Sequence, residues 1–204
     1  MKKLDMGDSH LLVDIIAKEI PNAKKLPLEI VEVGVHRGDL SRQILTKLPK
    51  SCLWMVDNWS VYHDQHSYRL SNDGCAALTR EEQEENRHAA CEVAVEFSGV
   101  DWSTSHRTRI LSQGSIEAAM VAFSERKSFH AAIIDASHLY EDVVIDLAIW
   151  FPLVRSGGVF AGHDIDHPKD KRGVWGVRRA VERFCRDNQL TFNTMGTCWW
   201  IVKP

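Results

Sequence analysis

Short apolar runs alternate with amphipathic segments along most of the 204-residue chain, and this alternation restricts the fold more than any other feature. Brief runs rich in β-branched residues predict buried strands, whereas apolar residues spaced three and four apart predict helices. Strands are predicted around residues 30–33, 53–57, 109–112, 129–135, 159–164, 190–194 and 198–202. Helices are predicted around residues 8–20, 40–48, 79–97, 115–124, 140–156 and 174–186.

Strands that alternate with helices are joined by right-handed crossovers and form a mostly parallel sheet. We therefore expect an α/β fold, a Rossmann-like, doubly wound sheet of seven strands with helices on both faces, in a single domain over residues 1–204. Only Met195, Gly196 and Thr197 separate the last two strands, so a hairpin is predicted and one strand should run antiparallel. Asp8 or Ser9 is expected to cap the first helix, and Gly157 with Gly158 to end the fifth.

Composition narrows the class of protein. The net charge is −3, which gives no field that would gather nucleic acid, and the basic residues between 169 and 186 alternate with acidic ones. No apolar run approaches the ~20 residues that span a membrane, and the first residues lack the pattern of a secretory signal. The five cysteines form no CxxC pair, so we expect reduced thiols and a cytoplasmic location.

The stretch EVGVHRGDL follows the first predicted strand and contains Glu32, Gly34 and Gly38. Glycines allow backbone to approach a ligand closely, and the helix that follows presents free N–H groups. Asp57 closes the next strand, where a carboxylate can accept hydrogen bonds from a ribose diol. These features predict a nucleoside-containing ligand. The middle glycine of a GxGxxG dinucleotide motif is missing, so an NAD-dependent oxidoreductase is the less favoured alternative.

Polar residues also close the other predicted strands: Gln113 with Gly114 and Ser115, then Asp135, then His163 with Asp164. Ligands of open α/β sheets bind beyond the carboxyl ends of the strands. We therefore expect one shared pocket at this edge.

The spacing of Glu32, Gly34 and Gly38 resembles the first motif of class I S-adenosylmethionine-dependent methyltransferases, with Asp57 at the position of their ribose-binding acid. The segment IIDASHLYEDVVIDLAIWFPLVRSGGVFAGHD resembles the small group that includes macrocin-type sugar O-methyltransferases. The resemblance covers about residues 29–165. It implies methyl transfer from S-adenosylmethionine to a hydroxyl of a small, sugar-like or diol acceptor. The implied cofactor residues are Glu32, Gly34, His36, Arg37, Gly38, Asp57, Gln113, Gly114, Ser115 and Asp135.

In that group, acids that match Asp135 and Asp164 hold a divalent cation such as Mg²⁺, and a histidine that matches His138 is the base. The resemblance therefore implies Asp135 and His138 as catalytic residues. The position beside Asp164 is often a second acid, and here it is His163, a candidate third metal ligand. This departure leaves open a module that binds the adenosyl ligand without catalysis.

Simpler structural roles are also open for several of these residues. His138 could cap the helix that starts near Tyr140, Asp164 could be a turn residue, and Ser115 could be a helix N-cap. The irregular insertion at about 58–106 is expected to cover the active site. The aromatic residues and histidines of this insertion are candidates for an acceptor-binding lid: Trp59, Tyr62, His63, His66 and Tyr68. A homo-oligomer is a further open expectation.

Overall fold

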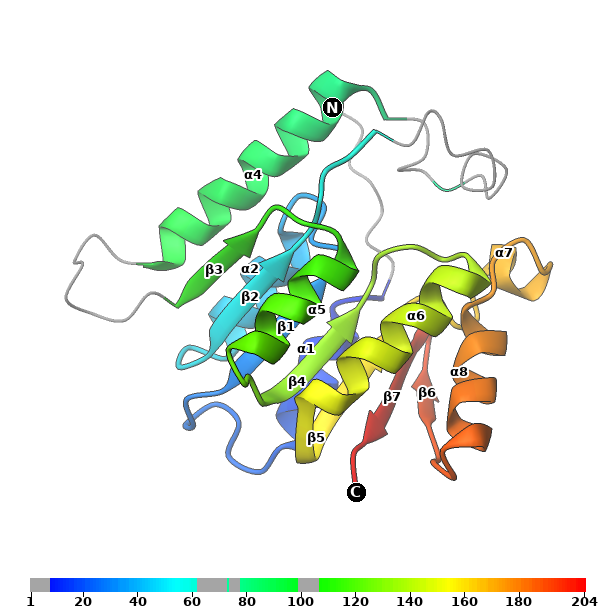
Figure 1. The fold of residues 1–204 in the computed structure, drawn as a ribbon. Helices are drawn as coiled ribbons and strands as arrows, with labels where there is room; N and C mark the ends of the chain where they lie inside the picture. Colours follow the sequence, from blue (N-terminus) through cyan, green and yellow to red (C-terminus); the bar gives the residue numbers. More distant parts are fainter. Residues whose placement is uncertain (1–7, 62–72, 74–77, 99–106) are drawn as a thin grey trace.

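The computed structural model describes residues 8–61, 73, 78–98 and 107–204. Within them lies a seven-stranded sheet in the order β3-β2-β1-β4-β5-β7-β6 (Figure 1). The strands are β1 (Glu29–Val33), β2 (Cys52–Val56), β3 (Thr108–Leu111), β4 (Phe129–Ile134), β5 (Val154–Gly162), β6 (Asn193–Met195) and β7 (Cys198–Val202). The helices are α1 (Leu11–Glu19), α2 (Asp39–Lys47), α4 (Arg80–Ser98), α5 (Ser115–Ser124), α6 (Tyr140–Trp150), α7 (Pro168–Lys171) and α8 (Val177–Asp187), with a 3₁₀ turn, η2 (Phe151–Leu153).

The pairing of the strands confirms the predicted topology. β1 pairs in parallel with β2 and β4, β2 with β3, and β4 with β5. β7 pairs antiparallel with both β5 and β6, so it is the one strand that runs against the others. The carboxyl ends of the five parallel strands β1 to β5 therefore meet at the same edge of the sheet.

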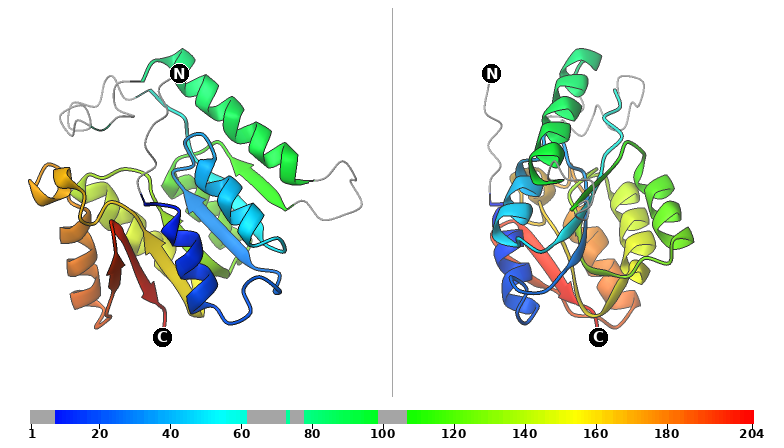
Figure 2. Two further views of the ribbon diagram at one scale, coloured as in Figure 1. Left: turned by 180° about the vertical axis from the view of Figure 1, so that it is seen from behind. Right: turned by 90° about the vertical axis from the view of Figure 1, so that its left-hand side faces the viewer.

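Helices cover both faces of the sheet, as Figure 2 shows from two further sides. Alternate residues of each strand point to opposite faces. Ile30 and Ile133 belong to the apolar core under α1, α2 and α4. Val31 and Ala132, their neighbours in sequence, belong to the core under α5, α6 and α8. No described helix is long and apolar enough to cross a membrane.

Two predicted helix ends are wrong. The fifth helix, α6, ends at Trp150, and β5 begins at Val154, so Gly157 and Gly158 lie inside this strand. Both glycines lie at an irregularity in the pairing of β4 with β5, where the register shifts between Phe129 and Ala131. Gly157 has φ +72°, and a Cβ on Gly158 would lie 2.9 Å from the carbonyl oxygen of His130.

The N-terminal end of α1 also differs from the prediction. His10 occupies the N-cap position and makes no side-chain capping bond. The Asp8 carboxylate instead accepts a hydrogen bond from the backbone N–H of Thr197, at 2.7 Å. Asp8 thus ties the start of α1 to the β6–β7 hairpin.

Candidate functional site

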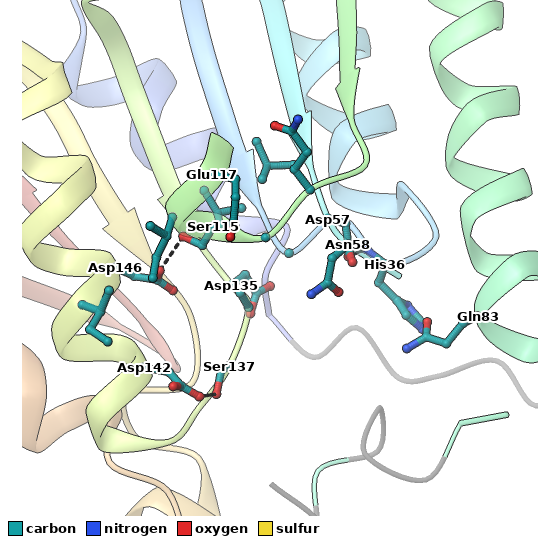
Figure 3. A pocket seen from close by; sticks show the side chains of 18 residues that line it. His36, Asp57, Asn58, Gln83, Ser115, Glu117, Asp135, Ser137, Asp142 and Asp146 are labelled. Carbon is teal, nitrogen blue, oxygen red and sulfur yellow. Dashed lines mark hydrogen bonds between the residues drawn. The ribbon is translucent and has the colours of Figure 1, made fainter. Parts of the chain in front are cut away.

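A cavity of about 370 Å³ lies at the carboxyl ends of β1, β2, β3 and β4 (Figure 3). Its volume falls in the range of small-molecule sites. Four of the five expected strand ends meet at this cavity, whereas His163 and Asp164, which follow β5, are not among its lining residues. Of the predicted cofactor residues, the cavity wall contains Gly34, His36, Asp57, Gln113, Gly114, Ser115 and Asp135. Glu32, Arg37 and Gly38 are not among the lining residues.

The two glycines of the first motif make room for protein backbone. Gly34 has φ +95°, and a Cβ there would lie 2.0 Å from the backbone oxygen of Asp135. Gly38 has φ +81°, and its Cβ would lie 3.2 Å from the Cα of Ala90 in α4. Gly34 thus allows the ends of β1 and β4 to meet, and Gly38 allows α4 to approach the start of α2.

Glu32 is a buried carboxylate beneath the turn, with an exposed fraction of 1%. The hydroxyl of Ser41 in α2 donates a hydrogen bond to its Oε2, at 2.5 Å. Burial, together with the nearby negative charges, raises the pKa of Glu32 to about 8 despite this bond. Glu32 therefore connects β1 to α2, and its predicted role toward the cofactor stays a prediction.

Asp57 follows β2 and points into the cavity wall. Its Oδ2 accepts a hydrogen bond from the backbone N–H of His36, and its Oδ1 accepts one from that of Trp59, each at 2.8 Å. Burial raises the pKa of Asp57, although these two bonds favour the charged form. Each carboxylate oxygen retains a further lone pair, so the group can still accept hydrogen bonds from a diol.

His36 and Arg37 separate in space. His36 lines the cavity, with φ +51°, and its Nε2 is buried without a hydrogen-bond partner among the residues described. Burial lowers the pKa of His36, so the ring is neutral and can offer this atom to a ligand. Arg37 turns away and donates from Nη1 to Asn86 of α4, at 3.1 Å.

Ser115, Asp146 and Trp150 form a buried hydrogen-bonded group beside Gln113 and Gly114. The Ser115 hydroxyl donates to Asp146 at 2.5 Å and accepts from the indole N–H of Trp150 at 2.8 Å. Burial raises the pKa of Asp146 to about 7. Gly114, not Ser115, is the N-cap of α5, so the predicted alternative of Ser115 as N-cap is wrong.

His138 lies among three carboxylates beyond β4. Its Nδ1 is 2.5 Å from Asp73, and its Nε2 is 2.9 Å from Asp164 and 3.9 Å from Asp135. Burial opposes protonation of His138, but these carboxylates raise its pKa well above the ordinary value. The side chain does not cap α6, whose N-cap is Leu139 and has no side-chain bond. The simpler role as a helix cap is therefore wrong.

His163 lies beside this group and faces in another direction. Its Nε2 is 2.9 Å from Asp8 and 2.8 Å from the hydroxyl of Thr197, while its Nδ1 is 3.2 Å from Asp164. Burial opposes protonation, but the carboxylates of Asp164, Asp135 and Asp8 raise the pKa of His163 to about 9. His163 thus links Asp164 to the N-terminal segment.

The donor groups around His138 fit a divalent cation. Asp135, His138 and Asp164 each offer a ligand atom, and these atoms lie within 4.8 Å of one another. Nε2 of His138 is buried and makes no bond of hydrogen-bond geometry, although two carboxylates face it. Nitrogen and carboxylate donors of this kind suit metals such as Mn²⁺, Fe²⁺ and Zn²⁺, and the carboxylates also suit Mg²⁺. His163 belongs to a separate group with Asp8 and Cys198.

Asp164 itself has φ +64°, an uncommon backbone conformation for a residue with a side chain. His138 and His163 lower the pKa of its carboxylate against the effect of burial. Such local strain is typical of functional sites. The alternative of a turn residue also holds, because the backbone oxygen of Asp164 accepts a hydrogen bond from the backbone N–H of His167 at 3.3 Å.

Several residues of the site were missed by the sequence analysis. Asp146 could have been found, because it is a carboxylate on the otherwise apolar buried side of α6. Asn58, Gln83, Glu117, Ser137 and Asp142 also line the cavity, and Figure 3 shows them around it. Trp175 and Asp73, which contact His138, gave no signal of their own.

Part of the predicted insertion reaches the site. Gln83 of α4 lines the cavity and donates to the backbone oxygen of Ser60 at 2.9 Å. Trp59 is buried, and its indole N–H donates to the backbone oxygen of His36 at 2.8 Å, so this side chain supports the wall of the cavity. The other predicted lid residues, Tyr62, His63, His66 and Tyr68, lie outside the described residues.

Comparison with protein families gives one match, to the model of a methyltransferase domain, over residues 31–165. No curated protein sequence gives a significant match. The matched range runs from β1 to the residues after β5, so it contains the cavity and the group around His138.

Solved structures of methyltransferases share the fold. The calicheamicin methyltransferase CalS11 has a TM-score of 0.68 at 15% identity, over 96% of this chain and 78% of that one. The O-methyltransferase TomG from Streptomyces achromogenes, in complex with SAM, has a TM-score of 0.63 at 16% identity, over 99% and 82% of the chains. The O-methyltransferase NovP has a TM-score of 0.57 at 18% identity, over 96% and 78%.

Proposed function

The chain belongs to the methyltransferase domain family, and we propose that it transfers a methyl group from S-adenosylmethionine to a hydroxyl of a small molecule. The observation that carries the proposal is the position of Asp135. Its side chain lies at the boundary between the cavity and the group around His138. A donor in the cavity and an acceptor beside His138 would therefore meet at this residue.

The cavity has the groups that an adenosyl ligand requires. Asp57 would accept hydrogen bonds from the ribose hydroxyls, and the unpaired Nε2 of His36 offers a further polar contact. Gln113, Gly114 and Ser115, at the start of α5, form the wall where the base would lie. Neutralisation of Asp146 by burial keeps that wall less charged near neutral pH.

Methyl transfer from a sulfonium to a hydroxyl is an in-line displacement. The new bond forms between the acceptor oxygen and the methyl carbon, and the carbon–sulfur bond breaks with its electron pair on sulfur. The hydroxyl proton must go to a base, because a neutral hydroxyl is a poor nucleophile. His138 Nε2, between Asp135 and Asp164, is the group we assign to receive it. Against the effect of burial, the two carboxylates raise the pKa of this ring, and a cation bound to them would offset their charge, so that the ring would be neutral when the acceptor reacts.

Asp135 and Asp164 would hold a divalent cation through their carboxylates, with Nε2 of His138 left unligated so that it can accept the proton. When bound, the cation would supply a Lewis acid that lowers the pKa of an acceptor hydroxyl. The carboxylates of Asp73, Asp135 and Asp164 around His138 favour an acceptor whose reacting part brings no negative charge of its own. A sugar or another diol meets this requirement.

Turnover tests this proposal directly. The full chain is incubated with S-adenosylmethionine, with and without Mg²⁺ or Mn²⁺, and a panel of sugars, nucleotide sugars and catechols. Methylated products are measured by mass spectrometry. We expect transfer to at least one hydroxyl compound and loss of transfer, by about 100-fold or more, in His138→Ala and Asp135→Asn. Full activity in both variants would contradict the site assignment.

The alternative is a module that binds the adenosyl ligand without catalysis. His163, at the position where the resembled group often has a second acid, favours it, since an imidazole held between Asp8 and Asp164 replaces a carboxylate ligand there. Binding of the donor with no transfer across the whole panel would support this alternative.

A further inference from the structure

Asp73 makes the closest contact to His138 of any described residue. Its Oδ2 lies 2.5 Å from Nδ1 of His138, and the two residues are 65 positions apart in the sequence. Both side chains are largely buried, with exposed fractions of 7% for Asp73 and 14% for His138. A buried, charge-assisted hydrogen bond of this length is stronger than one between neutral groups.

The remaining contacts of His138 fix the plane of its ring. Trp175 stacks on the imidazole at 4.1 Å between ring centroids, and His167 also stacks on Trp175, at 4.4 Å. The backbone N–H of Gly176 donates to the backbone oxygen of His138 at 2.9 Å. Stacking defines the plane of the ring but does not decide which nitrogen carries the proton.

The hydrogen bond to Asp73 determines which ring nitrogen of His138 carries the proton. A carboxylate only accepts hydrogen bonds, so the contact places a proton on Nδ1 of His138. In the neutral ring the lone pair is then on Nε2, which faces Asp135 and Asp164. Without Asp73 the neutral ring could carry its proton on Nε2 instead, and this tautomer cannot accept a proton at the site.

We propose that Asp73 is a positioning residue that holds His138 with the proton on Nδ1 and the lone pair of Nε2 directed at the reaction site. The residue comes from the insertion between β2 and α4, far in sequence from the strand ends that form the cavity. The insertion thus completes the site with a carboxylate. The proposal deepens the proposed function and rests on it for the consequence on turnover, but the hydrogen bond can be tested by itself.

The first experiment observes the bond in the full chain. ¹⁵N-histidine labelling gives signals from ten histidines, and the His138→Gln variant identifies that of His138. We expect a strongly downfield, slowly exchanging Nδ1 proton that is lost in Asp73→Ala. The matched control is Asp187→Ala, an exposed carboxylate on α8 that should leave the signal unchanged. A wild-type His138 whose Nδ1 carries no proton would overturn the proposal, whether or not any variant folds.

The second experiment separates a positioning role from a purely structural one. Asp73→Asn should lower kcat about 100-fold with KM and donor affinity unchanged, and Asp73→Glu should recover part of the loss. In a His138→Gln background, Asp73→Asn should cause no further loss, because the two residues act as a unit. Equal losses in both backgrounds, or a change in KM alone, would overturn the proposal.

The two experiments distinguish failure of this inference from failure of the proposed function. If the wild-type protein transfers no methyl group but His138 shows the Asp73-dependent proton, the proposed function fails and the pairing stands. If turnover is normal and Asp73→Asn has wild-type kcat, the pairing has no catalytic consequence and the inference fails.

Discussion

At the scale of single residues, buried carboxylates surround the site but differ in their partners. Within the described part of the chain, Glu32 has one hydroxyl donor and no cationic partner, whereas Asp164 lies between two imidazoles. Desolvation therefore raises the pKa of Glu32, while histidines lower that of Asp164. The sequence places both residues near strand ends, yet only Asp164 belongs to the group around His138.

Glu32 predicts a pH dependence of stability. Its pKa rises from 4.5 to about 8 on folding, so between these values the folded state holds more protons than the unfolded state. The free energy of unfolding therefore decreases as pH rises through this window. Glu32→Gln removes this dependence, so the stability of the variant relative to wild type should increase by on the order of 3 kcal/mol across the window, measured by urea denaturation.

Glu92→Gln is the control, because this carboxylate on α4 has 69% of its side chain exposed. It should leave the pH dependence of wild type in place. Parallel pH profiles for wild type and Glu32→Gln would show that Glu32 ionises normally in the fold.

At the scale of elements, the site depends on how closely strand ends approach one another. A Cβ on Gly34, which directly follows β1, would overlap the backbone after β4, whereas Gly157 in β5 has open space around its missing side chain. Both have positive φ, at +95° and +72°. An alanine at Gly157 would therefore test backbone strain alone, whereas an alanine at Gly34 would test backbone strain together with steric overlap.

Gly157→Ala should cost about 1 kcal/mol of stability from backbone strain alone. Gly34→Ala should cost at least about 3 kcal/mol, because its Cβ would overlap the backbone of Asp135 and force the strands apart. Urea denaturation measures both. Equal losses would show that the close approach of β1 and β4 is not required.

The N-terminal segment makes a second connection between elements. Asp8→Ala removes the acceptor for Thr197 and His163 and should cost roughly 1 to 2 kcal/mol. The pKa of Asp8 is lowered from 3.8 to about 2, so this stabilisation is present above pH 3.8 and is lost as pH falls toward 2. Asp14→Ala, which removes a half-exposed ion pair with Lys47, should cost less than about 0.5 kcal/mol, and thermal denaturation measures both variants.

The order of the elements and the polar strand ends could be predicted because they depend on local patterns. Short apolar runs that form buried strands, each followed by a carboxylate, are visible in the sequence around Asp57 and Asp135. The contacts of Asp73 with His138 and of Asp8 with His163 could not be predicted, since 65 and 155 residues separate the partners. The sequence predicts a helix end at Gly157 because glycine is common at helix ends. Its actual position inside β5 could not be predicted, because the irregular pairing there depends on the neighbouring strand β4.

At the scale of the whole molecule, the cavity should bind S-adenosylmethionine more tightly than NAD. The turn after β1 lacks the middle glycine of a dinucleotide site, and the family match is to a methyltransferase domain. S-adenosylmethionine at about 100 times its Kd should stabilise the fold by roughly 2.7 kcal/mol, visible as a rise in Tm of several degrees. NAD at the same concentration should leave Tm unchanged. A larger shift with NAD would favour the oxidoreductase alternative.

The central claim is that the cavity at the carboxyl ends of the strands binds S-adenosylmethionine through Asp57. Isothermal titration calorimetry of the full chain tests it most directly, with Asp57→Ala beside wild type and Asp187→Ala as the exposed control. The account predicts one donor per chain, an affinity at least about tenfold weaker in Asp57→Ala, and no change in the control. No binding by the wild-type protein, or equal affinity in Asp57→Ala, would contradict it.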